Sequence, residues 1–180
     1  MISDRATKSV RLSVLKVKGG VASDVVVCSD TVFGFTTHWI DDRSWACGGD
    51  LCPACMQGVH VRWVGFYPVI PMGDERRRVM LLELSSTAYD RFRGLLRMED
   101  YKTTAGVAVT VSRKKRNSPL VCEPIGTADA NLLKSLDKSS VWSAIAALYS
   151  LPPVKDDETI EAWSQRCETV AAGQIKRVIA

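Results

Sequence analysis

The sequence lacks any long apolar run. No stretch approaches the roughly 18 consecutive apolar residues that suggest a membrane-spanning helix, and the first 20 residues contain no continuous apolar segment of the signal-peptide type. We therefore expect a cytoplasmic protein, in the host-cell cytoplasm if the chain is viral, without a membrane partner. In such a compartment the six cysteines favour metal binding or free thiols over disulfides.

The sequence also lacks the motifs of the common enzyme classes. It contains no G-x-G-x-x-G, Walker or G-x-S-x-G pattern, and no H-x-E or H-E-x-x-H pattern. Its carboxylates form no recognisable catalytic pair, and there are only two histidines for acid–base chemistry. We therefore expect a protein without enzymatic activity.

A metal site is predicted by the segment of residues 38–60. It holds both histidines and three cysteines in the spacing C-x4-C-x2-C, and nearby glycines allow tight turns. A structural zinc needs four ligands. The predicted set is His38, Cys47, Cys52 and Cys55. His38 is preferred because it ends a predicted strand just before the loop, while His60 and the more distant Cys28 remain alternatives. An iron–sulfur cluster would accept a similar set, but zinc is the commoner occupant of so compact a site.

The hydrophobic pattern predicts a mainly β (α+β) fold. Alternating, β-branched segments predict strands over residues 10–17, 24–35, 59–70, 78–84, 105–113 and 120–125, with a short helix over 86–96. Short strands with a helix inserted late favour a small OB-like β-barrel with a zinc-knuckle loop over residues 1–126. Residues 127–180 have helical spacing and are predicted as a C-terminal helical extension. A β-sandwich with helical extensions is the alternative.

Basic and aromatic residues suggest a nucleic-acid surface. The net charge is +4, and the excess of Lys and Arg lies in residues 1–122. Aromatic platforms in a basic groove hold single-stranded nucleic acids. The candidate binding residues are Arg62, Trp63, Tyr67, Arg76, Arg77, Arg78, Arg113, Lys114, Lys115 and Arg116. Because side chains alternate along a strand, at most one of the faces bearing Arg62 and Trp63 can form the groove. The competing interpretation is an ordinary solvated surface above an aromatic core.

The segment of residues 35–124 resembles phage-encoded single-stranded-DNA-binding proteins with an OB fold. The resemblance rests on "LLEL" and a short helix, followed by a glycine, an alternating strand, the basic turn "RKKR" and a returning strand that ends in proline. It implies a DNA-binding accessory of replication or recombination in a phage or mobile element, and some members carry a Cys/His zinc loop.

The chain departs from that family at its C-terminus. Members commonly end in an acidic tail, whereas this chain ends in "GQIKRVIA". We expect its C-terminal helices to contact replication or recombination proteins or a second copy of the chain. The alternative function is a zinc-stabilised interaction module that docks on a polymerase or another nucleic-acid machine.

Overall fold

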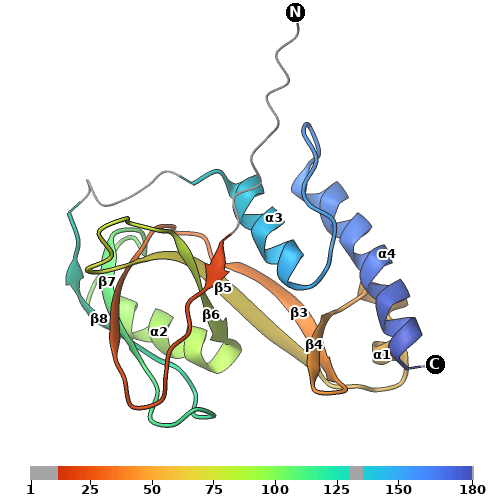
Figure 1. Ribbon diagram of the computed structural model, residues 1–180, viewed down its shortest axis with the longest axis horizontal. Coiled ribbons are helices and arrows are strands. Elements are labelled where there is room, and N and C mark those ends of the chain that lie inside the picture. Colours follow the sequence, from red (N-terminus) through yellow and green to blue (C-terminus); the bar gives the residue numbers. More distant parts are fainter. Residues whose placement is uncertain (1–11, 130–135, 180) are drawn as a thin grey trace, which may run out of the picture.

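The computed structural model describes residues 12–129 and 136–179 of the chain. These residues form a mixed α+β architecture with eight strands in one sheet and four α-helices (Figure 1). The strands are β1 (Ser13–Val14), β2 (Ser23–Val27), β3 (Phe33–Ile40), β4 (Arg43–Ala46), β5 (Val61–Pro71), β6 (Met80–Ser85), β7 (Val107–Ser112) and β8 (Val121–Thr127). The helices are α1 (Pro53–Met56), α2 (Ser86–Met98), α3 (Lys138–Leu148) and α4 (Ile160–Val178), and a 3-10 turn, η1 (Gly49–Leu51), precedes α1. The predicted α+β class is confirmed.

The long strand β5 organises the sheet. Along one edge it pairs with β6, and along the other it pairs first with β3 and then, near its C-terminal end, with β2. The sheet continues from β2 to β7 and β8, while β4 extends it beyond β3 and β1 lies parallel to β6. This branching makes β3 and β4 an arm that leaves the main sheet (Figure 1).

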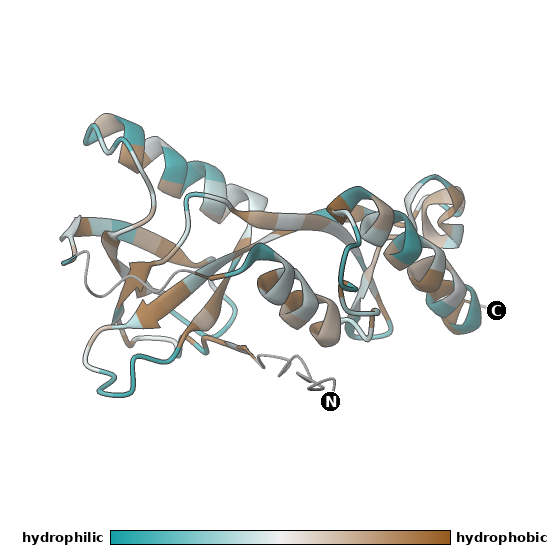
Figure 2. Cartoon of the chain, turned by 90° about the horizontal axis from the view of Figure 1, so that it is seen from above, coloured by the Kyte–Doolittle hydropathy of each residue, from teal (hydrophilic) through white to brown (hydrophobic). Residues whose placement is uncertain are grey.

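Helices cover both faces of the sheet because both faces are apolar. Tyr67, Leu84 and Val109 share one core with Phe92 of α2. The other face carries Phe33, Phe66 and Leu81, which share a second core with Val141 and Ile145 of α3. Figure 2 accordingly shows α2 and α3 on opposite sides of the sheet. The helices after residue 136 therefore complete the core instead of standing apart from it.

The sheet is open, which corrects the expectation of a closed barrel. Among the described residues no hydrogen-bonded pairing joins β6 to β8, and β1 and β8 are the two ends of the main strand order. Helix α2 packs against β8 as well as β5 and β6, so side chains of a helix fill the place where a closing strand pair would lie. None of the described helices is long and apolar enough to cross a bilayer.

Strand β4 lies where the sequence predicts only loop. Asp41 and Asp42, which connect it to β3, both have positive φ angles, of 49° and 58°. Two left-handed residues in succession are the signature of a tight two-residue hairpin turn, which usually contains Asn-Gly or Asp-Gly. The Asp-Asp pair gives a weak sequence signal for that turn. The first predicted strand is present only as β1, and part of its range lies outside the described residues.

Candidate metal centre

Four side chains converge at the end of the β3–β4 arm. They are His38 on β3, Cys47 just after β4, Cys52 at the N-cap of α1 and Cys55 within α1. Their ligand atoms all lie within 4.8 Å of one another. Nε2 of His38 is 3.4 Å from Sγ of both Cys52 and Cys55, and Sγ of Cys47 is 3.6 Å from Sγ of Cys55. The predicted ligand set is thus brought together.

These separations match the edges of a tetrahedron around a zinc ion. Zn–S bonds of about 2.3 Å and Zn–N bonds of about 2.0 Å place two sulfur atoms about 3.8 Å apart, and a sulfur and a nitrogen about 3.5 Å apart. The Cys47–Cys55 distance and the two distances from His38 are within about 0.2 Å of those values, and all four ligand atoms lie within 4.8 Å of one another. The residues present therefore fit a four-coordinate ion.

A backbone carbonyl fixes the orientation of the His38 ring. Nδ1 of His38 lies 3.3 Å from the carbonyl oxygen of His60. Because a carbonyl can only accept, Nδ1 carries the proton, and the lone pair of Nε2 is free for a metal. His38 is fully buried, whereas the His60 side chain is exposed. Cys28 lies just after β2, outside the cluster, and its thiol donates to the carbonyl of Val26.

Local sequence shapes the loop that carries the cysteines. Pro53 stands at the first position of α1, where its missing N–H costs no hydrogen bond, and Cys52 is the N-cap residue. Gly48 is required by packing, since a Cβ there would lie 2.7 Å from Cβ of Ala172 and 2.8 Å from backbone atoms of that residue. The loop therefore lies directly against α4.

The ionisation of the three cysteine thiols favours binding of a cation. Burial first, and then hydrogen bonding and charge repulsion from Cys47 and Cys52, raise the pKa of Cys55 to about 12. Burial also opposes ionisation of Cys52, but hydrogen bonds from the backbone of Cys55, Gly48 and Ala54 outweigh it and lower its pKa. Three sulfur atoms so close together cannot all be thiolates without a compensating positive charge, which a divalent ion supplies.

Helix α4 covers the cluster. Its residue Ile175 is fully buried and forms one apolar group with Cys52 and Ala54. Ile40 and Trp45 of the β3–β4 arm pack around the same group. The site is therefore enclosed by side chains from β3, β4, α1 and α4, although these elements are distant in sequence.

The structure buries one of the two predicted stacking residues and packs the other against a helix. Tyr67 has 0% of its surface exposed, and burial raises its pKa to about 12. Trp63 is half-buried, lies across Gly34 and Gly65, and contacts the ring of Tyr89 at a centroid distance of 5.1 Å. A base cannot reach Tyr67, and Trp63 is already used in packing α2 onto the sheet.

The predicted cations lie mainly on two connections between strands. Arg76, Arg77 and Arg78 are exposed between β5 and β6, where Nε of Arg78 lies 3.0 Å from Oδ2 of Asp74. The other group lies between β7 and β8. There, Arg113 is half-buried and donates through Nη1 to the carbonyl of Arg116, whereas Lys114, Lys115 and Arg116 are exposed.

Two further spatial arrangements were not predicted from the sequence. Trp39 is 50% exposed, and the guanidinium of exposed Arg62 lies 5.9 Å from its ring centroid. Gly19 packs against the backbone of Lys115 and Arg116, and the N–H of Gly20 donates to the carbonyl of Arg113 over 2.8 Å. This contact places the loop that carries the exposed residues Lys16 and Lys18 beside the basic turn. The only feature of the sequence that indicates this close backbone contact is the "GG" pair between two predicted strands.

Comparison with known proteins gives no relatives: no protein-family model matches the chain, and no curated protein or solved structure resembles it significantly.

Proposed function

We propose that the His38 cluster is a structural zinc site. The observation that carries this proposal is the convergence of one imidazole nitrogen and three sulfur atoms within 4.8 Å of one another, since four protein ligands would leave no position for water or substrate. Thiolate and imidazole ligands in a tetrahedral arrangement are typical of zinc. The ion would hold the β3–β4 arm, α1 and α4 together.

Metal analysis tests this assignment. The purified protein should contain about one zinc per chain, and Cys52→Ser should lose the metal and lower the thermal unfolding temperature, because structural metal binding is coupled to folding. Cys122→Ser is the matched control: Cys122 is equally buried but belongs to the core beside α2. A zinc-free native protein, or equal zinc content in the two variants, would refute the assignment.

We also propose that the sheet is a partly open relative of the OB barrel. The pairings β2–β5, β5–β6, β2–β7 and β7–β8, with α2 between β6 and β7, follow the order of a five-stranded Greek-key barrel that lacks its closing pair. OB folds bind oligonucleotides over their second and third strands and over the loops between strands 1 and 2 and between strands 4 and 5. The corresponding loops here are the metal-bearing segment and the β7–β8 turn.

The basic turn is the better candidate of these surfaces for contacting nucleic acid. The outer face of β5 and β6, which would correspond to the binding face, carries Phe66 and Leu81 and is covered by α3. The turn, in contrast, is exposed. With its neighbouring loop it presents five cations, which we call the basic-turn surface: Lys16, Lys18, Lys114, Lys115 and Arg116.

The function we propose is therefore single-stranded nucleic-acid binding, with DNA as the preferred ligand, in an accessory role in replication or recombination. Clustered cations neutralise phosphates and release counterions, which gives affinity without sequence specificity. The exposed Trp39 of β3, with Arg62 of β5 beside it, offers a ring for base stacking. Neither element needs a catalytic group, in keeping with the expected absence of enzymatic activity.

A salt titration tests the basic-turn surface. Labelled single-stranded and double-stranded oligonucleotides are titrated at several salt concentrations with the parent and with a variant in which all five cations are replaced by Gln or Ser. Each lost phosphate contact on a single strand lowers the slope of log K against log salt by about 0.7, so the variant should lose up to about 3.5 units. Its thermal stability should change little, because these side chains are exposed.

The matched control removes two cations elsewhere. Lys176 and Arg177 lie in the last turn of α4, at the opposite end of the molecule from the β7–β8 turn (Figure 1). Their replacement by Gln should leave the slope unchanged. Unchanged affinity and slope in the five-residue variant would refute binding through this surface.

A protein-docking role is the second candidate, and one observation favours it. Leu51 and Met56, beside the metal ligands, are 81% and 79% exposed. Two large apolar side chains held outward by a rigid metal loop are typical of a protein contact. Absence of oligonucleotide binding, together with reduced binding of a replication protein by Leu51→Ser and Met56→Ser, would favour this candidate.

A further inference from the structure

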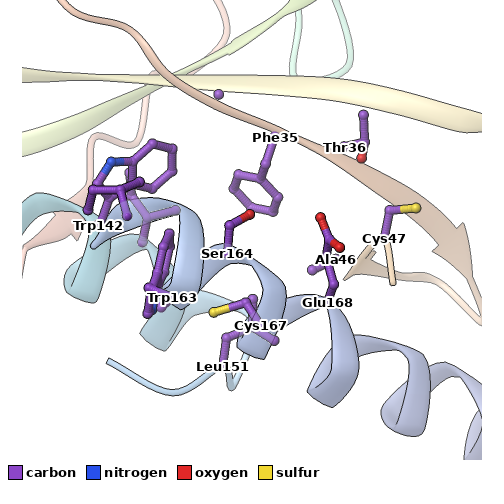
Figure 3. A pocket seen from close by; sticks show the side chains of 14 residues that line it. Phe35, Thr36, Ala46, Cys47, Trp142, Leu151, Trp163, Ser164, Cys167 and Glu168 are labelled. Carbon is purple, nitrogen blue, oxygen red and sulfur yellow. The ribbon is translucent and has the colours of Figure 1, made fainter. Parts of the chain in front are cut away.

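A pocket of about 250 Å³ lies between the sheet and the C-terminal helices. It is bounded by β3 and the end of β4 on one side, and by α3, α4 and the segment between them on the other (Figure 3). Neither the exposed Trp39 nor the basic turn contributes to it, but its wall includes Cys47 of the candidate metal centre.

Aromatic and apolar side chains form most of the pocket wall. Phe35, Trp142 and Trp163 line it together with Ile145 and Leu151. Packing fixes the rings in place: the centroids of Trp142 and Trp163 are 5.3 Å apart, and Nε1 of Trp163 donates to the carbonyl of Pro152 over 2.9 Å. A preformed apolar wall of this kind suits the hydrophobic part of a small ligand.

The only side chain of ordinary charge among the described residues that line the pocket is acidic. Glu168 contributes an exposed carboxylate at the rim of the pocket, where a Cβ on Gly49 would lie 2.6 Å from its Oε2. Figure 3 shows this carboxylate beside Ala46, and no Lys or Arg is among the described residues that line the pocket. Glu168 takes part in none of the ion pairs found among the described residues, and its neighbour Arg166 is engaged by Glu158. No positively charged side chain of the wall pairs with this carboxylate, which is open to solvent.

We propose that this pocket binds a small hydrophobic cation, an aryl- or alkylammonium compound. The apolar part lies against the aromatic wall, and the ammonium group meets the Glu168 carboxylate. Aromatic faces attract cations through their quadrupoles, and this attraction grows as the cation leaves water. An anion of the same shape meets repulsion, and a neutral molecule gains only the apolar contact.

Three probes of similar shape test the proposal on the zinc-loaded protein by calorimetry and ligand-observed NMR. They are 2-phenylethylammonium, the neutral 2-phenylethanol and the anionic 3-phenylpropanoate. The ammonium probe should bind about tenfold more tightly than the alcohol, and the carboxylate most weakly. Glu168→Gln should lower the affinity for the ammonium probe to that of the alcohol while leaving the alcohol unaffected.

Glu161→Gln is the matched control, because it removes the same charge from the exposed first turn of the same helix, outside the pocket. It should leave all three affinities unchanged. Equal binding of ammonium and alcohol by the parent, an unaltered preference in Glu168→Gln, or binding of none of the probes would each overturn the proposal. Oligonucleotide binding is not involved in any of these outcomes.

Discussion

Replacing Ile175 by alanine should cost much more stability in the zinc-bound protein than in the protein stripped of metal. Ile175 is fully buried and packs against Cys52 and Ala54 of the metal loop. Truncation of a fully buried isoleucine costs about 3 kcal/mol when its surroundings are rigid. Without the ion, the loop loses the bonds that fix it, so it can relax around the smaller side chain and the cost should fall to about 1 kcal/mol.

The assay is a thermodynamic cycle between metal and side chain. The free energy of urea unfolding is measured for the parent and for Ile175→Ala, first with saturating zinc and then with a chelator. The loss of stability caused by the mutation should be about 2 kcal/mol larger with zinc, and this excess is the coupling between metal and side chain. Ile145→Ala is the control, because Ile145 is as well buried, in the core formed with α3. Its cost should be the same in both conditions.

Two results would refute this reasoning. Equal costs for Ile175→Ala with and without zinc would mean that the metal does not organise the surface under α4. Complete unfolding of the chelated parent would mean that the two cores beside α2 and α3 cannot sustain the sheet, in contrast to our expectation that they are independent of the metal. Classical zinc fingers, which have no such cores, do unfold when the metal is removed.

Three further predictions concern single residues. Gly65→Ala should destabilise the protein by about 1–3 kcal/mol and shift its tryptophan fluorescence, since a Cβ there would lie 2.2 Å from the Trp63 ring; an unchanged spectrum and melting temperature would contradict the packing. A hydrogen bond from Arg166 lowers the pKa of Glu158 from 4.5 to about 2. The carboxylate therefore stabilises the fold above pH 4.5 and ceases to do so as the pH falls toward 2. The melting temperature of Glu158→Gln should be lower than that of the parent at pH 7 and equal to it near pH 2. A difference in melting temperature that does not change with pH would contradict this. Trp39→Ala should weaken oligonucleotide binding without altering its salt slope, because stacking releases few counterions; a changed slope, or unchanged affinity, would exclude a stacking role.

The metal ligands were predictable because their signal is local. Cys47, Cys52 and Cys55 lie within nine positions, and the turn residues between them define how they meet. The choice of His38 also followed from local reasoning, since a strand that ends just before the loop directs its last side chains toward it. The role of His60 was not predictable, because it acts through its carbonyl and not through its imidazole.

The accessibility of the aromatic residues was not predictable from alternation. The period of two correctly separates the face of Arg62 and Phe66 from the face of Trp63 and Tyr67, as the strand register shows. It does not reveal that α2 covers one of these faces and α3 the other. Contacts between segments far apart in the chain decide which helix covers which face, and the periodicity of a single strand does not report those contacts.

The position of α3 and α4 has a consequence for synthesis on the ribosome. The sheet strands all emerge before residue 128, yet the apolar face of Phe33, Phe66 and Leu81 stays uncovered until α3 follows, and the metal loop stays uncovered until α4 does. A nascent chain of this protein therefore exposes apolar surface from the synthesis of β6 until that of α3 and α4. We expect it to depend on early zinc capture, or on a chaperone, to remain free of aggregation until α4 has been synthesised.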